Sequence, residues 1–448
     1  MTDSRRGSNA TDDTTSDRLS RRRFTGALAA AGAVGLAGCS GTDGEATTGE
    51  PTDEMDTPMD TPTETEAGTE TDEPTEEPAP NPDVDVLNYA LTLEHLENAF
   101  YREGLAEFSD DEIMMADSLS EFGETLRMQV PEYLALAGEH EAAHVDAISA
   151  TIEDLGGTPV GEADYDFGYS TPSEFLATAG ALENTGVAAY TGAAGAIKAN
   201  AVLGAAAGIQ SVEARHASFL NVINGEMPYP AGVEEAASVE EVFEIAGQFI
   251  TSEVSSPAPL DGEDEPTAER KADDDTSDVD VLNYALTLEH LENAFYREGL
   301  AEFSDDELMN ASALSEYGET LRMTVPDRLR TAGAHEAAHV DAIADTVEQL
   351  GGTPVEEAEY DFGYTNPSEF LGVARALENT GVSAYAGQAG TVSADAVFDA
   401  AVGIHAVEAR HASFLNELNV ESPFPMAVDE PRTMEEVTEI AGQFIVEE

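Results

Sequence analysis

Lysine is almost missing from this chain of 448 residues, and so is any balance of positive charge. Lys198 and Lys271 are the only lysines, against 91 acidic residues, and the formal net charge is −72. This charge strongly disfavours nucleic acid and anionic lipid headgroups as partners, because both are polyanions. We therefore expect most acidic residues to be solvated surface, and only glutamates on apolar helix faces need chemistry to explain them.

Cysteine and strand-forming segments are also scarce. Cys39 is the only cysteine, so neither an intramolecular disulfide nor a thiolate metal site can form. Stretches rich in Val, Ile and Thr that would form strands are missing, which favours an all-α protein. The most apolar run near the N-terminus spans about 15 residues, fewer than the roughly 20 that a permanent membrane-spanning helix needs.

The N-terminus resembles an export signal. Arg21-Arg22-Arg23-Phe24 precedes an apolar stretch that ends in Leu36-Ala37-Gly38-Cys39. This order resembles a twin-arginine signal (residues 1–39) with a lipoprotein cleavage box, which implies lipidation at Cys39 and anchoring to the outer face of the cell membrane. Residues 40–83, rich in Thr, Glu, Asp and Pro, are predicted to form a disordered stalk, and the acidic, lysine-poor composition resembles that of extreme halophiles.

An internal duplication sets the folding units. Residues 84–250 align without a gap on 279–445, and residues 84–112 are identical to 279–307. We predict two domains, 84–250 and 279–446, separated by a disordered acidic linker over 251–278. The halves are expected either to dock on each other as a pseudo-dimer or to take part in a homo-oligomer.

Helical periodicity predicts four core helices in each half. In the first half, apolar stripes surround Glu94, Glu141 with His144, Glu183, and Glu213 with His216. The second helix is predicted to start at Pro131 and stop at Gly156-Gly157, and the third to be capped by Thr171 and Pro172. A further amphipathic helix is predicted after Ser238 and, in the second half, after Thr433.

The charged residues of these stripes lie near the middle of each predicted helix. Residues three apart are neighbours on one helix face, so Glu141 and His144 point the same way. In an antiparallel bundle the four levels meet, and buried unpaired carboxylates would cost several kcal/mol each. Two divalent cations would balance four glutamates.

This order of motifs resembles the carboxylate-bridged dimetal pattern of ferritin-like four-helix bundles, such as ferritin, rubrerythrin and manganese catalase. The L-E-H-L-E-N-A-F-Y and V-E-A-R-H-A-S-F segments look most like secreted ferritin-like domain proteins. The resemblance implies two tandem bundles and, in each, two bridging carboxylates (Glu141 and Glu213 in the first half). The implied metal ligands are Glu94, Glu141, His144, Glu183, Glu213, His216, Glu289, Glu336, His339, Glu378, Glu408 and His411.

Four tyrosines lie two helical turns beyond a candidate ligand: Tyr101, Tyr190, Tyr296 and Tyr385. They are expected either to orient a ligand carboxylate or to pack in the core. The oxygen and imidazole ligand set suits iron or manganese, with zinc as the alternative. The resemblance implies oxidation of Fe(II) or consumption of peroxide, with dioxygen or peroxide as the oxidant.

Two other functions stay open. His140-Glu141-x-x-His144 and His335-Glu336-x-x-His339 match the H-E-x-x-H motif of zinc proteases. Alternatively, the domains are non-enzymatic metal-binding or stress-related surface modules.

Several polar residues near the stripes are expected to be less central. Glu97 is predicted on the flank of its helix, and His95 and His290 at the surface or between helices. Arg215 and Arg410 are expected either to pair with a partly buried carboxylate or to tune the centre through its ligands. The exchange of Gln210 for His405 is expected to be a surface change, with a difference between the two sites as the alternative.

Overall fold

The computed structural model describes residues 81–252, 260 and 277–446, which fall within one compact unit, Asn81–Glu448. The predicted signal, Cys39, all but the last three residues of the predicted stalk and most of the predicted linker lie outside the described residues. Among the described residues no helix is long and apolar enough to cross a membrane.

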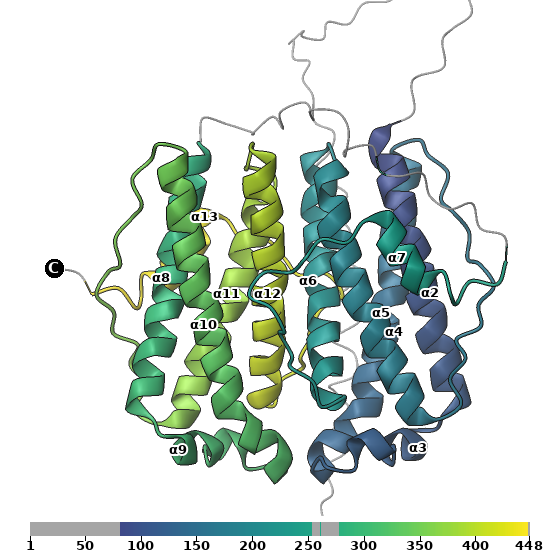
Figure 1. The fold of residues 1–448 in the computed structure, drawn as a ribbon, viewed down its shortest axis with the longest axis horizontal. Coiled ribbons are helices and arrows are strands. Elements are labelled where there is room, and N and C mark those ends of the chain that lie inside the picture. Colours follow the sequence, from purple (N-terminus) through teal and green to yellow (C-terminus); the bar gives the residue numbers. More distant parts are fainter. Residues whose placement is uncertain (1–80, 253–259, 261–276, 447–448) are drawn as a thin grey trace, which may run out of the picture. The chain divides into compact units, whose positions relative to one another are not determined.

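The first half is an all-α bundle of four long helices (Figure 1). Short helical segments connect the first helix to the second, and one short helix follows the bundle. Its elements are α2 (Pro82–Glu107), α3 (Asp110–Met114), η1 (Asp117–Leu119), α4 (Glu124–Asp154), α5 (Pro172–Ala193), η2 (Ala194–Ala196), α6 (Asn200–Ile223) and α7 (Val239–Ala246).

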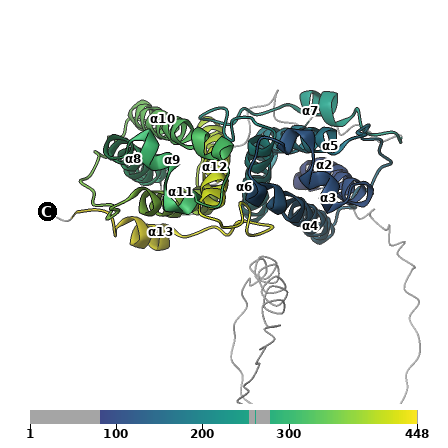
Figure 2. The same cartoon turned by 90° about the horizontal axis from the view of Figure 1, so that it is seen from below.

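The second half repeats this order, except that its described residues have no counterpart of η2. Viewed along the helices, the long helices of each half surround a common core, and the short last helix of the half lies outside them (Figure 2). The elements are α8 (Asp278–Glu302), α9 (Asp305–Met309), η3 (Ser312–Leu314), α10 (Glu319–Gln349), α11 (Pro367–Gln388), α12 (Asp395–Leu418) and α13 (Met434–Ala441). The all-α class and the two repeated bundles predicted from the sequence are confirmed.

The predicted helix starts are partly right. Thr171 caps α5 by accepting a hydrogen bond from the Glu174 amide, and Ser238 forms a capping box at α7. The predicted start at Pro131 is wrong, because α4 begins at Glu124 and carries Pro131 inside it. Leu126 and Val130 are buried in the core, and this packing holds the turns before the proline in the helix despite the missing amide donor.

The two halves pack against each other through α6 and α12. The Ser218 hydroxyl donates to the Arg410 carbonyl and the Ser413 hydroxyl donates to the Arg215 carbonyl, each at a distance of 2.9 Å. Because the later residue of one helix meets the earlier residue of the other in both bonds, the two helices run in opposite directions. A separate buried cluster of mostly alanine side chains lies between them: Val187, Ala214, Ala217, Val382, Ala406, Ala409 and Ala412. Small side chains let the helix backbones approach closely.

The segments that follow α6 and α12 do not stay over their own bundles. We call residues 224–238 the first strap and residues 419–433 the second strap. In Figure 1 the first strap runs from the lower end of α6 across α12 before it returns to α7. Its Glu234 amide donates to the Gly403 carbonyl of α12, and the Asp429 amide of the second strap donates to the Gly208 carbonyl of α6.

Candidate metal centre

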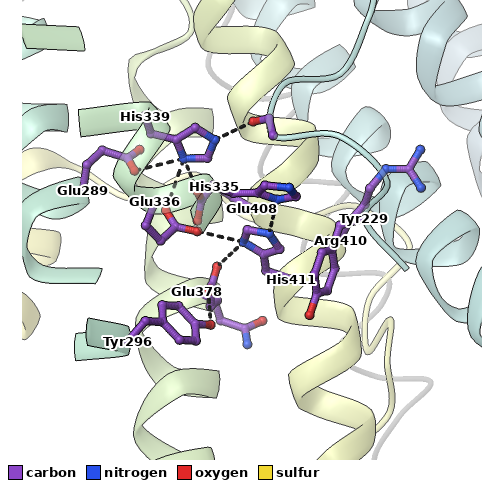
Figure 3. A network of polar contacts seen from close by, with 12 residues as sticks. Tyr229, Glu289, Tyr296, His335, Glu336, His339, Glu378, Glu408, Arg410 and His411 are labelled. Atoms are coloured by element: carbon purple, nitrogen blue, oxygen red, sulfur yellow. Dashed lines mark hydrogen bonds and ion pairs between the residues drawn. The ribbon is translucent and has the colours of Figure 1, made fainter. Parts of the chain in front are cut away.

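Four helices bring the predicted ligands of each half to one buried place. In the first half, Glu94 lies on α2, Glu141 and His144 on α4, Glu183 on α5, and Glu213 and His216 on α6. All six side chains are fully buried, and the six counterparts of the second half are at most 1% exposed. Figure 3 shows the second-half cluster, with the carboxylates and imidazoles pointing toward one another.

The six residues of each half form two overlapping groups. In each group the ligand atoms lie within 4.8 Å of one another. One group holds Glu94 and His144, the other holds Glu183 and His216, and Glu141 and Glu213 belong to both. In the second half the shared residues are Glu336 and Glu408. Two adjacent sites that share two carboxylates are the arrangement that a carboxylate-bridged ion pair requires.

His144 turns one ring nitrogen toward several carboxylates. Its Nδ1 lies 3.0 Å from Glu213 Oε1, 3.1 Å from Glu94 Oε2 and 3.2 Å from Glu141 Oε2. Its Nε2 lies 2.6 Å from the Ala427 carbonyl oxygen, which can only accept a hydrogen bond, so Nε2 carries a proton. In a neutral ring Nδ1 then carries no proton, and its lone pair faces three carboxylates. A cation between them removes the repulsion, and the donor set fits a divalent metal ion.

His216 repeats this geometry with a different partner. Its Nδ1 lies 3.0 Å from Glu141 and 3.2 Å from Glu183, while its Nε2 lies 3.1 Å from His140 Nδ1. Burial and the neighbouring imidazoles lower the pKa of His140 to about 2, so this ring is neutral, and a single proton is shared between its Nδ1 and His216 Nε2 in this hydrogen bond. His140 is absent from both ligand groups. The paired histidines of the H-E-x-x-H hypothesis therefore do not converge on one point.

The tyrosines reach across the bundle. Tyr101, on the helix of Glu94, donates to Glu183 over 2.5 Å, and Tyr190, on the helix of Glu183, donates to Glu94. Tyr296 and Tyr385 make the equivalent bonds to Glu378 and Glu289 in the second half, and Figure 3 shows the Tyr296 contact. Each tyrosine thus orients the carboxylate of the other helix, which helical spacing alone did not indicate.

The remaining carboxylate oxygens are short of donors. Glu141 Oε1 and both oxygens of Glu213 accept no hydrogen bond, although they are buried. Burial, and then the neighbouring carboxylates, raise the pKa of Glu213 well above its usual value. Burial would lower the pKa of His144, but the carboxylates of Glu94 and Glu141 outweigh it and raise that pKa. Without metal the cluster must therefore hold protons, whereas two divalent ions would satisfy the orphaned oxygens.

The prediction of Glu97 on the helix flank is wrong, and its counterpart Glu292 is buried in the same way. Both side chains are 3% exposed, and burial followed by the carboxylate of Glu213 raises the pKa of Glu97. A Cβ added at Gly186 would lie 2.9 Å from Glu97 Oε1 and 3.5 Å from Glu213 Oε2, so both carboxylates occupy the space that this glycine leaves. The Glu94-x-x-Glu97 spacing carried the signal, since residues three apart share a helix face.

Other predictions for polar residues have mixed outcomes. His95 Nε2 lies 3.1 Å from the Val160 carbonyl, away from the cluster. Arg215 forms an ion pair with Asp429 at 2.7 Å, and Arg410 forms one with Glu234 at 2.9 Å, so both arginines have the carboxylate partners that were expected. The prediction of a surface change at His405 is wrong.

His405 lies in the interface between the halves. Its side chain is 3% exposed, and its Nδ1 lies 3.3 Å from Gln210 Oε1 in the other half.

Fold and site together define a pair of fused four-helix bundles, each with a buried carboxylate and histidine cluster suited to two metal ions. The ferritin-like domain model matches the chain twice, at residues 82–226 and 277–421, and the chain belongs to this family. No curated protein matches the chain.

Proposed function

We propose that each half binds two iron or manganese ions and that this centre reacts with dioxygen or peroxide. The observation that carries the proposal is that Nδ1 of each site histidine faces two or three buried carboxylates, among which Glu141 Oε1 and both oxygens of Glu213 have no hydrogen-bond donor of their own. Glu94 and His144 would hold one ion and Glu183 and His216 the other, with Glu141 and Glu213 bridging them. When bound, such an ion pair supplies the two electrons that dioxygen or peroxide takes up.

The protein side chains would hold the centre in place and manage protons. Tyr101 and Tyr190 donate to Glu183 and Glu94 and keep these carboxylates turned inward. The buried carboxyl group of Glu97 lies next to Glu213 in the space beside Gly186, where it would exchange protons with the centre. No cysteine cluster can deliver electrons, so a peroxidase mechanism would need an external donor.

An apolar cavity favours dioxygen as the oxidant. A cavity of about 60 Å³ bordered by Tyr190 is lined mainly by aliphatic side chains from α2, α4 and α6, among them Leu87, Ile148 and Leu203. The second half has an equivalent cavity of about 80 Å³ bordered by Tyr385. Apolar walls suit dioxygen better than hydrogen peroxide, which would lose hydrogen bonds to water on the way in.

Metal analysis tests the proposal. Protein loaded with Fe(II) or Mn(II) without oxygen should retain about four ions per chain, two in each bundle, and the Glu141→Ala/Glu336→Ala variant should lose most of them. Glu139→Ala removes an exposed carboxylate of the same helix α4 and should retain the full amount, which makes it the matched control. Zinc at about two ions per chain, or no metal above trace, would contradict the proposal.

A second candidate function is metal binding for stability alone. Complete burial of all six first-half ligands favours it, because no substrate larger than a few atoms reaches them without movement. Single-turnover oxidation separates the two functions. Fe(II)-loaded protein that consumes no oxygen and no peroxide, yet unfolds at higher denaturant than the metal-free protein, would support the structural role.

We also propose that the chain is exported by the twin-arginine route and anchored through lipid at Cys39. Support comes from the order of Arg21-Arg22, apolar stretch and Cys39. Mass spectrometry of the mature N-terminus should find a lipid-modified Cys39. A Cys39→Ser variant should lose membrane association, whereas persistence of an unprocessed N-terminus would refute the proposal.

A further inference from the structure

Each strap lies over the cluster of the opposite half. The second strap places the Ala427 carbonyl 2.6 Å from Nε2 of His144, and the first strap places the Gly232 carbonyl 2.5 Å from Nε2 of His339. In Figure 3 a loop in the colour of the first half passes the second-half cluster and receives the bond from His339. The hydrogen-bond acceptor of one site histidine in each cluster is therefore supplied by the other half of the chain.

The same straps contact the second site histidine of each cluster. The Phe424 ring stands edge-on to His216 with centroids 4.6 Å apart, and it also touches His140 at 5.8 Å. Tyr229 stands in the same way against His411, at 4.5 Å. Each aromatic residue lies between two prolines, which hold the strap extended at this point. One strap thus touches both imidazoles of the opposite cluster.

Anchors on either side fix the strap carbonyls. Two residues after Ala427, the Asp429 amide donates to Gly208 over 3.1 Å and its carboxylate accepts from Arg215. A Cβ at Gly208 would lie 2.7 Å from Val428 Cγ1 and 2.8 Å from the Asp429 carbonyl, so α6 needs glycine where the strap crosses it. Gly403 stands in the same relation to Val233 and Glu234.

We propose that the straps are reciprocal positioning elements, so that each metal centre is built from both halves of the chain. This inference rests on the proposed metal binding. A ligating histidine is oriented by the acceptor of its other ring nitrogen, and loss of such a partner typically costs 10–100-fold in metal affinity. Damage to a strap should therefore weaken the centre of the opposite half and spare its own.

Single-centre variants make this crossed pattern measurable. Glu336→Ala leaves only the first centre and Glu141→Ala only the second, and Co²⁺ titration followed by its visible absorption bands reports the remaining one. In the Glu336→Ala background, Phe424→Ala should weaken Co²⁺ binding about tenfold or more and change the bands, whereas Tyr229→Ala should leave both unchanged.

In the Glu141→Ala background the effects of the two strap variants should be exchanged. Phe424→Leu and Tyr229→Leu repeat the comparison with less loss of volume, in case the alanine variants unfold. Weakening of the centre in a strap's own half, or equal effects at both centres, would overturn the proposal.

A metal-independent measurement keeps the two proposals separable. In a double-mutant cycle on the metal-free protein, Arg215→Ala and Asp429→Ala should be non-additive in the free energy of unfolding, because the two side chains pair across the halves. Arg215→Ala and Glu234→Ala should be additive, since Glu234 pairs with Arg410 instead. The opposite result would refute the strap exchange even if metal binds. Coupling of Arg215 to Asp429 without any Co²⁺ binding would leave the exchange intact as architecture, but would overturn both its role in positioning metal ligands and the proposed function.

Discussion

Replacing Gly381 by alanine should weaken metal binding in the second half while the free energy of unfolding of the metal-free protein stays nearly the same. A Cβ at this position would lie 2.8 Å from Glu408 Oε2 and 3.1 Å from Glu292 Oε1. Contacts below 3.0 Å are essentially never found for a Cβ, so at least the Glu408 carboxylate must move. Glu408 is fully buried and belongs to both ligand groups of the second half, so it cannot move without disturbing them.

The expected magnitudes have opposite signs. Alanine in place of glycine inside a helix stabilises it by about 0.5–1 kcal/mol. Forcing a buried side chain off its rotamer costs about 0.5–1.5 kcal/mol, so the metal-free free energy of unfolding should change little. Metal affinity has no compensating gain and should fall about tenfold or more, or at least about 1.4 kcal/mol.

Gly204→Ala is the matched control. Gly204 lies in α6 with nothing within 4 Å of an added Cβ, so the substitution should stabilise the chain by about 0.5–1 kcal/mol and leave metal binding alone. Both variants are compared in the Glu141→Ala background, by urea unfolding without metal and by Mn²⁺ titration. Equal Mn²⁺ affinity in Gly381→Ala and Gly204→Ala would refute the placement of Glu408 in the centre.

Three further predictions concern hydrogen bonds and burial. Tyr101→Phe removes the donor to a buried carboxylate and should cost about 1–3 kcal/mol of unfolding free energy, whereas Tyr89→Phe on the same helix removes a hydroxyl without a hydrogen-bond partner and should cost nothing; urea unfolding of both variants checks this. Burial lowers the pKa of His405 from 6.5 to about 4, so on acidification the imidazole is protonated in the unfolded chain before it is protonated in the folded one. The free energy of unfolding should therefore fall by up to ~3 kcal/mol as the pH falls from 6.5 to 4, and urea unfolding of His405→Gln at pH 7.5 and pH 4 should show a correspondingly smaller decrease. Asp83 accepts hydrogen bonds from the amides of Lys198 and Ala199 at the start of α6, so Asp83→Ala should lower the free energy of unfolding by about 0.5–2 kcal/mol. Thermal and urea unfolding measure this change, and an unchanged free energy would contradict the prediction.

Helical periodicity indicated the all-α fold and the charged residues within its apolar stripes, whereas their assignment as metal ligands came from the family resemblance. A carboxylate in an apolar stripe reports the face of its helix, and the repeat supplies each observation twice. This is why Glu94, Glu141, Glu183 and Glu213 were expected at one level of the bundle, and the structure places them together. The wrong start of α4 has another cause, because propensity at Pro131 was overridden by packing of the preceding turns.

Partners across the bundle were beyond such reasoning. Periodicity gives no information on which helix lies opposite, so Tyr101 was assigned to its own helix and not to Glu183. The strap contacts depend on where a loop of 15 residues travels, and a loop has no period. Glu97 differs from these, since its spacing from Glu94 was visible and its burial follows from the small residue at Gly186 on the facing helix.

The two straps differ at nine of their 15 positions. Residues 84–112 and 279–307, which carry one ligand helix of each centre, are identical. At equivalent positions the first strap has Tyr229 and Glu234 where the second strap has Phe424 and Asp429. Each of these residues contacts the opposite half. In a symmetric dimer of single domains both straps would carry the same sequence. Fusion into one chain removes that constraint, so the surroundings of the two centres can diverge while their ligands stay the same.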